Sequence, residues 1–437
     1  MLPSNRQHAR MQLPKSLLTL LAAATCLVLA ACGSHSSSSA AVSNVRFVNA
    51  DAAAFLEVNF NGAVQFAAQG PASASAYLSL PSASYAVTVS GTSGGSTVAS
   101  PPLTLSLNGS LTYSLIAYVR DGAVFVTAVT ESQAAPAAGT STLGVSNLSP
   151  DSGALDVYVV APGTADLTGL VPTFASTIFR PTPGYATFLA GTFDVVATAA
   201  GNPRDVRMRW PSVSLGSGLI QALVTTSTPG GALVNAALLT QVGAVDFLAT
   251  TNARVRLVSA LPTTAAAPVT ATVGTVSIGP VFSPNPGTYT LVAGNSTAYT
   301  LSVNGTAVAT LPAARFSTGG DFTVLVYGTV GAPLVALLTD DNQLPLVAEQ
   351  VNLRLVNGGV NVPGGVSLYA NNVQAANQVG YGDASDYFSV VSADSVLELI
   401  EASAAPVSTT VLLSPAGSVY TMFVIDTTLT PYLIRDR

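Results

Sequence analysis

Internal repetition is the feature of this sequence that most constrains its fold. Three similar segments, 45–50 (VRFVNA), 255–260 (VRLVSA) and 353–358 (LRLVNG), recur along the 437 residues. A weaker copy, 144–150 (GVSNLSP), lies between the first two, which makes the spacings about 100, 110 and 98 residues. Similarity at a regular period indicates one structural unit that is repeated. We therefore expect four copies of one small domain.

Each copy also ends in a similar way, with two β-rich runs joined by a turn. These closing segments span residues 113–130, 219–240, 322–339 and 420–434. In the first of them the turn is Asp121-Gly122, and this dipeptide readily supplies the positive φ angles of a tight hairpin. The closing segments therefore predict a β-hairpin at the C-terminal end of every copy.

Within the copies the apolar runs are short and typical of strands. Residues 155–159 (LDVYV) alternate apolar and polar side chains, and 56–60 (LEVNF) and 366–369 (VSLY) are their counterparts. No window of 12 residues after the N-terminal segment has a helical period bounded by caps. Short strands at regular spacing, separated by turn residues, predict antiparallel sandwiches. We therefore expect an all-β chain of four tandem antiparallel β-sandwiches, each of about 100 residues.

The N-terminal segment has the features of an export signal. Arg6, Arg10 and Lys15 precede an apolar run over residues 17–31, which is short for a membrane span of about 20 residues. The run ends in Leu-Ala-Ala-Cys-Gly at 29–33, which resembles the lipobox of bacterial lipoproteins. That resemblance implies cleavage between Ala31 and Cys32 and acylation of Cys32. The alternative is an ordinary secretory cleavage site that happens to precede a cysteine.

A lipid anchor at Cys32 has three consequences. Cys26 is lost with the signal, so no disulfide can form within the processed chain. Several acyl chains attach a protein firmly, at about 0.8 kcal/mol per buried methylene. Gly33 stands where an inner-membrane retention signal has Asp in enterobacterial lipoproteins, so the resemblance implies the outer membrane.

These features divide the chain into six parts. We predict a signal peptide at 1–31, an acylated Cys with a Ser-rich tether at 32–42, and four β-sandwich repeats at 43–139, 140–248, 249–347 and 348–437.

The second copy also resembles a known family. Residues 147–158 (NLSPDSGALDVY), followed by 191–195 (GTFDV), are similar to the signature of domain-of-unknown-function family 4397. The resemblance is best in the second copy and fair in the first, whereas the third and fourth lack a clear match to Pro150-Asp151. It implies an immunoglobulin-like β-sandwich, repeated in tandem on exported bacterial lipoproteins. The family has no established activity, so the resemblance implies no catalytic role.

Composition excludes most enzyme chemistry in the predicted repeats. The two histidines, His8 and His35, lie in the signal and the tether, and Lys15 is the only lysine. Histidine general bases, Ser-His-Asp triads, thiolate sites and Schiff bases are therefore excluded there. Beyond residue 31 the sequence has 12 Arg against 21 acidic residues, a net charge of about −9. That sign disfavours nucleic acid, and we expect no cofactor.

Carboxylate pairs are the chemistry that remains. Asp340 and Asp341 follow a predicted strand and are expected in a solvated turn; the alternative is a weak calcium site, because hard cations need several oxygen ligands. Asp383 and Asp386 are expected in a loop. We expect Glu398 and Glu401 to face solvent at the end of a strand. A glycosidase needs only two such acids.

One basic cluster stands out. Arg204, Arg207 and Arg209 lie beside Trp210, the only tryptophan. Alternation over 205–210 predicts an exposed strand with its arginines on one face and Trp210 packed beneath them. The alternative is a ligand patch for an anionic glycan or a lipid headgroup, with Trp210 as a stacking surface.

The sequence thus favours a non-catalytic, lipid-anchored protein of the bacterial outer membrane. It would act as a binding, adhesion or spacer array, attached to the membrane and contacting an envelope protein or a glycan. The alternative is a carbohydrate-binding or carbohydrate-active envelope protein that uses Trp210 or paired carboxylates.

Overall fold

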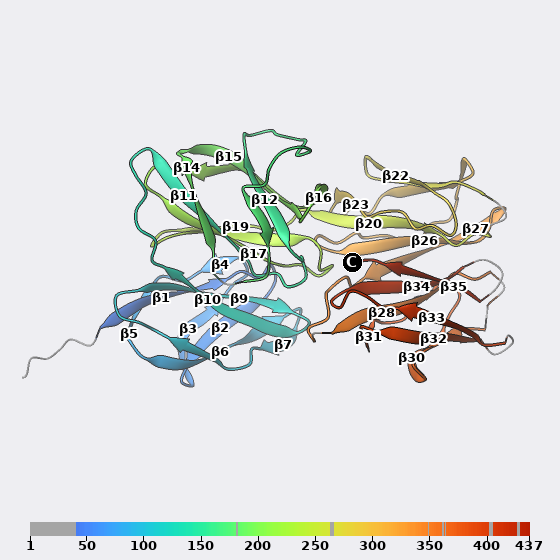
Figure 1. Ribbon diagram of the computed structural model, residues 1–437, viewed down its shortest axis with the longest axis horizontal. Helices are drawn as coiled ribbons and strands as arrows, with labels where there is room; N and C mark the ends of the chain where they lie inside the picture. The colour runs from blue at the N-terminus through green and yellow to red at the C-terminus, as the bar shows by residue number, and fades with distance from the viewer. Residues whose placement is uncertain are drawn as a thin grey trace, which may run out of the picture.

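The computed structural model describes residues 41–180, 182–262, 266–347, 349–360, 362, 364–401, 405–425 and 429–437. These residues form strands, turns and loops. Among them, no helix has the length and apolar character that crossing a membrane requires. The all-β prediction is therefore confirmed, and the strands group into four successive sandwiches (Figure 1).

The strands are numbered in chain order and grouped here by repeat. Repeat 1 contains β1 (Val42–Asn49), β2 (Phe55–Phe60), β3 (Ala63–Gln69), β4 (Ser73–Ala74), β5 (Leu78–Pro81), β6 (Ser84–Ser93), β7 (Ser96–Ala99), β8 (Leu103–Ser106), β9 (Thr112–Arg120) and β10 (Ala123–Glu131). Repeat 2 contains β11 (Thr140–Asn147), β12 (Leu155–Val160), β13 (Phe174–Thr177), β14 (Gly184–Leu189), β15 (Gly191–Ala199), β16 (Asn202–Leu215), β17 (Ile220–Ser227), β18 (Val234–Thr240) and β19 (Val245–Leu248). Repeat 3 contains β20 (Asn252–Ser259), β21 (Val269–Val273), β22 (Val276–Val281), β23 (Thr290–Ala293), β24 (Tyr299–Val303), β25 (Thr306–Ala307), β26 (Asp321–Thr329) and β27 (Ala332–Asp340). Repeat 4 contains β28 (Gln350–Asn357), β29 (Val366–Ala370), β30 (Val373–Val379), β31 (Phe388–Val391), β32 (Asp394–Glu401), β33 (Val407–Leu412), β34 (Val419–Ile425) and β35 (Thr430–Arg435).

The same central strand order, with the opening strand beside the closing hairpin, recurs in every repeat. The closing segments form hairpins, as predicted: β9–β10, β17–β18, β26–β27 and β34–β35. The opening strand lies beside the first strand of that hairpin. In repeats 2, 3 and 4 this sheet packs on a separate second sheet, such as β30-β29-β32-β33 in repeat 4, whereas in repeat 1 the pairing of β7 with β10 joins both layers into one ten-stranded sheet. An immunoglobulin constant domain divides seven strands into sheets of four and three, whereas repeats 3 and 4 each have two sheets of four. Repeats 3 and 4 are therefore β-sandwiches, as expected, with one more strand than an immunoglobulin constant domain.

In each repeat, the pairing of the opening strand differs from the expected antiparallel pattern, and in repeat 1 β7 is also parallel to β10. The opening strand runs parallel to the first hairpin strand, in the pairs β1/β9, β11/β17, β20/β26 and β28/β34. A tight turn forces its two strands to be antiparallel, but no turn connects these pairs. In repeat 4, for example, Arg354 is opposite Thr421, with most of the repeat between them in sequence.

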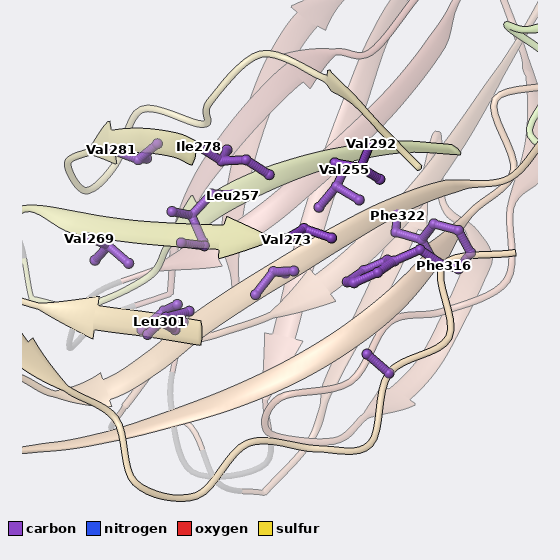
Figure 2. Close-up of a cluster of buried hydrophobic side chains, with 14 of the residues drawn as sticks. Val255, Leu257, Val269, Val273, Ile278, Val281, Val292, Leu301, Phe316 and Phe322 are labelled. Atoms are coloured by element: carbon purple, nitrogen blue, oxygen red, sulfur yellow. The ribbon is translucent and has the colours of Figure 1, made fainter. Parts of the chain in front are cut away.

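Each sandwich encloses its own apolar core. In repeat 3 the core takes Val255 and Leu257 from β20, Val269 from β21 and Phe322 from β26, with Phe316 between the sheets (Figure 2). Phe316 packs edge-to-face on Phe322, with the ring centroids 5.4 Å apart. Alternate residues of each strand point inward, as the period of two in the sequence predicted.

The repeats pack in pairs. In each repeat, the sheet that contains the opening strand turns its outer face, away from its own core, toward the partner repeat. Val48, Ile116 and Tyr118 of repeat 1 meet Val224 and Leu239 of repeat 2 in one apolar cluster. A second cluster joins repeats 3 and 4 in the same way. The opening strand and the first hairpin strand are buried on both faces. Most of their side chains on both faces are therefore apolar. The two pairs follow one another along the long axis, with repeats 1 and 2 at one end and repeats 3 and 4 at the other (Figure 1).

Candidate functional site

A buried arginine and a carboxylate fix the interface between repeats 1 and 2. Arg46 on β1 is 2 % exposed, and its Nη2 lies 2.9 Å from Oε1 of Glu131 on β10. The same guanidinium donates to the carbonyl oxygens of Thr240 and Gly243 in repeat 2, at 3.1 and 2.5 Å. The hydroxyl of Tyr77 donates to Glu131 Oε2 at 2.8 Å. Every charge removed from water here is thus paired and hydrogen-bonded.

The interface between repeats 3 and 4 repeats this design with two arginines. Arg256 on β20 and Arg354 on β28 flank Asp340 on β27, and Arg354 Nη2 lies 2.5 Å from Asp340 Oδ1. Asp340 Oδ2 also accepts hydrogen bonds from Tyr289 and Thr323, at 2.7 and 2.6 Å. Burial alone would raise the pKa of Asp340, but Arg354 and Arg256 outweigh it and hold that pKa below its usual value.

In repeat 2, a glycine stands where the other repeats have these arginines. Arg46, Arg256 and Arg354 occupy equivalent register positions opposite Ser114, Thr323 and Thr421, and Gly144 is opposite Ala222. A Cβ on Gly144 would lie 2.5 Å from the Tyr185 ring, so that ring fills the space that an arginine takes elsewhere. The sequence analysis missed these arginines. The available signal was an arginine within an otherwise apolar segment, which recurs in the opening segments of three repeats.

The structure revises the interpretation of Asp340 and Asp341. Asp340 is 1 % exposed, so the prediction of a solvated turn is wrong for it. Its carboxylate is committed to Arg354, Tyr289 and Thr323, which leaves it unsuited to calcium. Asp341 is exposed, and its Oδ1 accepts the backbone N–H of Gln343 at 3.0 Å. No metal-binding group of His, Cys, Asp or Glu occurs among the described residues.

The other candidate carboxylates lie in different environments. Asp383 and Asp386 are exposed in a loop, as expected. Glu398 is half-buried on β32. Glu401 is 6 % exposed, so the prediction that it faces solvent is wrong. Its strand β32 lies between β29 and β33 in the second sheet of repeat 4, and alternate residues of β32 are buried.

The predicted basic patch is divided by a bulge in β16. Register shifts beside Thr198 displace Arg207 from the alternation, and Arg207 is buried and donates to the Ala232 carbonyl at 3.2 Å. Arg209 donates to the Thr164 carbonyl at 2.8 Å, and Arg204 is exposed. Trp210 packs against the core, as expected. The prediction of an exposed strand with its arginines on one face is therefore wrong for Arg207.

The predicted lipidation and cleavage residues, Ala31 and Cys32, lie outside the described residues. The described part begins at residue 41 and enters β1 at one end of the long axis (Figure 1).

A cavity of about 460 Å³, lined by both apolar and charged side chains, lies where repeats 1, 2 and 3 meet. A buried ion pair forms part of its wall: Arg120 donates through Nε and Nη2 to Asp151, at 2.7 and 2.6 Å. Arg120 Nη2 also donates to the carbonyl of Leu344, whose N–H donates to Asp151 at 3.0 Å. These contacts connect the two pairs of repeats.

Three further carboxylates, from Asp51, Asp121 and Asp341, line this junction cavity beside Asp340, which is already paired with Arg354. Asp51 accepts the backbone N–H groups of Ala53, Ala54 and Val119 and so holds its own loop. Burial raises the pKa of Asp121, only partly offset by Arg120. Burial also raises the pKa of Asp341, and the charges of Asp121 and Asp151 add to that rise.

A second cavity, of about 690 Å³ and mainly apolar, lies in repeat 3 beside the β26–β27 hairpin. Val308, Leu311, Tyr327 and Leu334 are among its lining residues. The hairpin lies at the end of the long axis that is farther from β1 (Figure 1). The neighbouring edge strand β25 is only two residues long, whereas its counterpart β33 has six.

Comparison with known proteins identifies a family for part of the chain. Residues 43–158 match the model of the family described as "Domain of unknown function (DUF4397)". The match covers repeat 1 and reaches Tyr158 in repeat 2, so it lies mainly in the first copy rather than the second. No curated protein matches the chain.

Two solved structures show only a remote similarity. The Bacillus anthracis TIE protein has 10 % identity and a TM-score of 0.15, over 95 % of this chain and 79 % of that one. The product complex of SpuA, a multi-modular glycogen-degrading pneumococcal virulence factor, has 10 % identity and a TM-score of 0.16. That match covers 86 % of this chain and spans 38 % of the SpuA chain. Neither likeness supports an argument about this protein.

Proposed function

We propose that this chain, in which residues 43–158 match a family of domains of unknown function, is a non-catalytic, lipid-anchored binding platform of the bacterial outer membrane. The lipobox-like sequence ending at Cys32 supports the anchor. The described body begins nine residues after Cys32, and Ser36 to Ser39 lie in the connecting tether.

The observation that carries the proposal is the way the repeats are joined. Apolar clusters hold repeat 1 to repeat 2 and repeat 3 to repeat 4, and buried ion pairs reinforce both interfaces. The Arg120–Asp151 pair then connects the two halves through Leu344. Contacts of this kind suit a rigid body that presents fixed surfaces, rather than a flexible string of domains.

The use made of the charged residues also supports a role without catalysis. Beyond the tether the sequence has no His, Cys or Lys. The buried acids Glu131, Asp151 and Asp340 are neutralised by arginines that lock interfaces. Carboxylates bound in this way are poor general acids or nucleophiles, because arginine stabilises the charged form. The expected partners are an envelope protein or a glycan, and not a nucleic acid.

The anchor is tested by labelling cells with a radioactive fatty acid and isolating the protein. We expect label in the natural chain and none in Cys32→Ser, which should also leave the outer-membrane fraction. Cys26→Ser is the matched control and should retain the label. Labelling of Cys32→Ser, or an unlabelled natural chain in the soluble fraction, would contradict the anchor.

Protease added to intact cells then determines which side of the membrane carries the repeats. Cleavage on intact cells supports adhesion or binding of an extracellular polymer. Protection until lysis supports a periplasmic scaffold and excludes the adhesion role.

A further inference from the structure

We propose that the junction cavity between repeats 1, 2 and 3 binds a short neutral saccharide. Its volume of about 460 Å³ is within the usual range of small-ligand sites, about 300–1,000 Å³. This inference deepens the binding role proposed above by giving it a ligand class.

Two buried polar atoms at the cavity are without hydrogen-bond partners among the described residues. One is Arg120 Nη1, a donor, on a residue that is 3 % exposed. Its nearest charged neighbour is Asp121 Oδ2, at an ion-pair distance of 3.5 Å. The other is Gln343 Oε1, an acceptor on a half-buried side chain that lines the cavity. Unpaired buried polar groups cost stability and are rare in folded proteins.

A hydroxyl group is the ligand chemistry that meets both needs. It can accept from Arg120 Nη1 and can donate to Gln343 Oε1. The carboxylates of Asp121 and Asp341 at the same cavity can accept further hydroxyl protons. Adjacent hydroxyls on one small molecule are characteristic of sugars, and a sugar ring would supply donors and acceptors together.

The charges around the cavity favour a neutral ligand over an ionic one. An anion would meet Asp51, Asp121 and Asp341. A simple cation is disfavoured for two reasons. It cannot accept the unpaired N–H of Arg120, and its charge would be repelled by that guanidinium. Asp121 and Asp341 keep contact with solvent, and partial desolvation raises the pKa of each carboxyl. Hydroxyl donors from a ligand can hydrogen-bond to these carboxylates without bringing charge into the cavity.

The test uses the processed, acylated chain purified in detergent, so its outcome is independent of where the protein lies in the cell. Maltose, cellobiose, lactose and chitobiose are titrated by calorimetry against the natural chain and two variants. Asp121→Asn suits the left-handed backbone at that position, where φ is 50°. Gln343→Leu removes the unpaired acceptor at similar volume. Asp386→Asn, on an exposed loop of repeat 4, is the matched control.

We expect at least one disaccharide to bind with a Kd below about 10 mM. Each cavity variant should weaken binding about tenfold, as expected for a lost buried hydrogen bond, and Asp386→Asn should not. In the natural chain, the side-chain amide resonances of Gln343 should shift on titration, which requires no variant to fold. Equal melting temperatures of the variants would show that weaker binding is not unfolding.

Three results would overturn the inference. The first is no binding by any of these disaccharides below about 10 mM. The second is saccharide binding that leaves the Gln343 amide unshifted and survives both cavity variants. The third is binding of spermidine or sulfate that the cavity variants abolish while no saccharide binds, since this would assign the cavity to an ion.

Discussion

At the scale of single residues, an arginine inside an apolar strand decides how each pair of repeats fits together. Arg46, Arg256 and Arg354 are each at most 2 % exposed. A buried ion pair adds little net stability compared with a well-packed apolar pair, but loss of one partner leaves a charge without compensation. These arginines therefore specify which surfaces meet more than they strengthen the contact.

Replacing Arg354 with Met should test this role. Asp340 would lose its nearest cation and keep only Arg256, at 3.7 Å. We expect the free energy of unfolding to fall by about 3–5 kcal/mol, measured by chemical denaturation. Arg315→Met, at an exposed site of repeat 3, is the control and should change stability little. Equal effects of the two substitutions would contradict a structural role for Arg354.

The cavity carboxylate Asp341 allows a prediction about pH. Asp341 keeps contact with solvent, but the surrounding protein partly desolvates its carboxyl and so raises its pKa in the folded chain. The folded carboxyl thus binds its proton more tightly than the unfolded one, so the charged form costs stability at neutral pH. That cost disappears as the pH falls below both pKa values.

Asp341→Asn should therefore melt at a higher temperature than the natural chain at about pH 7 and at the same temperature near pH 3. Asparagine can still accept the N–H of Gln343, so the turn is preserved. A melting difference that stays constant between these pH values would show that the charge of Asp341 is not responsible.

At the scale of elements, the first strand of each closing hairpin serves two cores at once. On β26, Val324 faces the sandwich of repeat 3, and Leu325 faces repeat 4. Both are fully buried. A strand that is buried on both faces loses the polar–apolar alternation of a surface strand, which is why these segments contain runs of adjacent apolar residues, such as Val324, Leu325 and Val326.

Leu325→Ala should weaken the contact between repeats 3 and 4 without opening either sandwich core. We expect a loss of about 2–5 kcal/mol, the usual cost of truncating a buried leucine, from denaturation curves. Leu412 on β33 is 62 % exposed, so Leu412→Ala should cost far less. A loss at Leu325 no larger than at Leu412 would show that the repeats do not pack through this face.

At the scale of the whole molecule, pairing turns a possible rod into a compact body. Two interfaces join the repeats within pairs, and the junction around Arg120 joins the pairs. The platform's dimensions are therefore set by side-by-side packing and not by the number of repeats laid end to end.

Small-angle X-ray scattering can check this arrangement. A compact chain with the length of residues 41–437 has a radius of gyration of about 21 Å. We expect a value slightly above this, because the two pairs lie along one axis (Figure 1). A radius above about 35 Å would indicate an extended string of separate repeats and would contradict the pair interfaces.

The sequence by itself determined the features that depend on near neighbours. Alternation predicted the inward-facing residues, turn dipeptides such as Asp121-Gly122 predicted hairpins, and the recurring openings predicted repeated sandwiches. These features follow from local backbone geometry and the period of two of a strand.

Only the tertiary structure decided how the repeats contact one another, because these contacts join residues that are far apart in the chain. Arg46 meets Gly243, and Arg120 meets Leu344, across separations that no local pattern encodes. Asp340 is buried against Arg354 of the next repeat. The residues next to Asp340 in the sequence do not show this contact, so they suggested a solvated turn. Likewise the junction cavity exists only where three repeats converge. The sequence specified the units, and the burial of paired charges between them decided how they assemble.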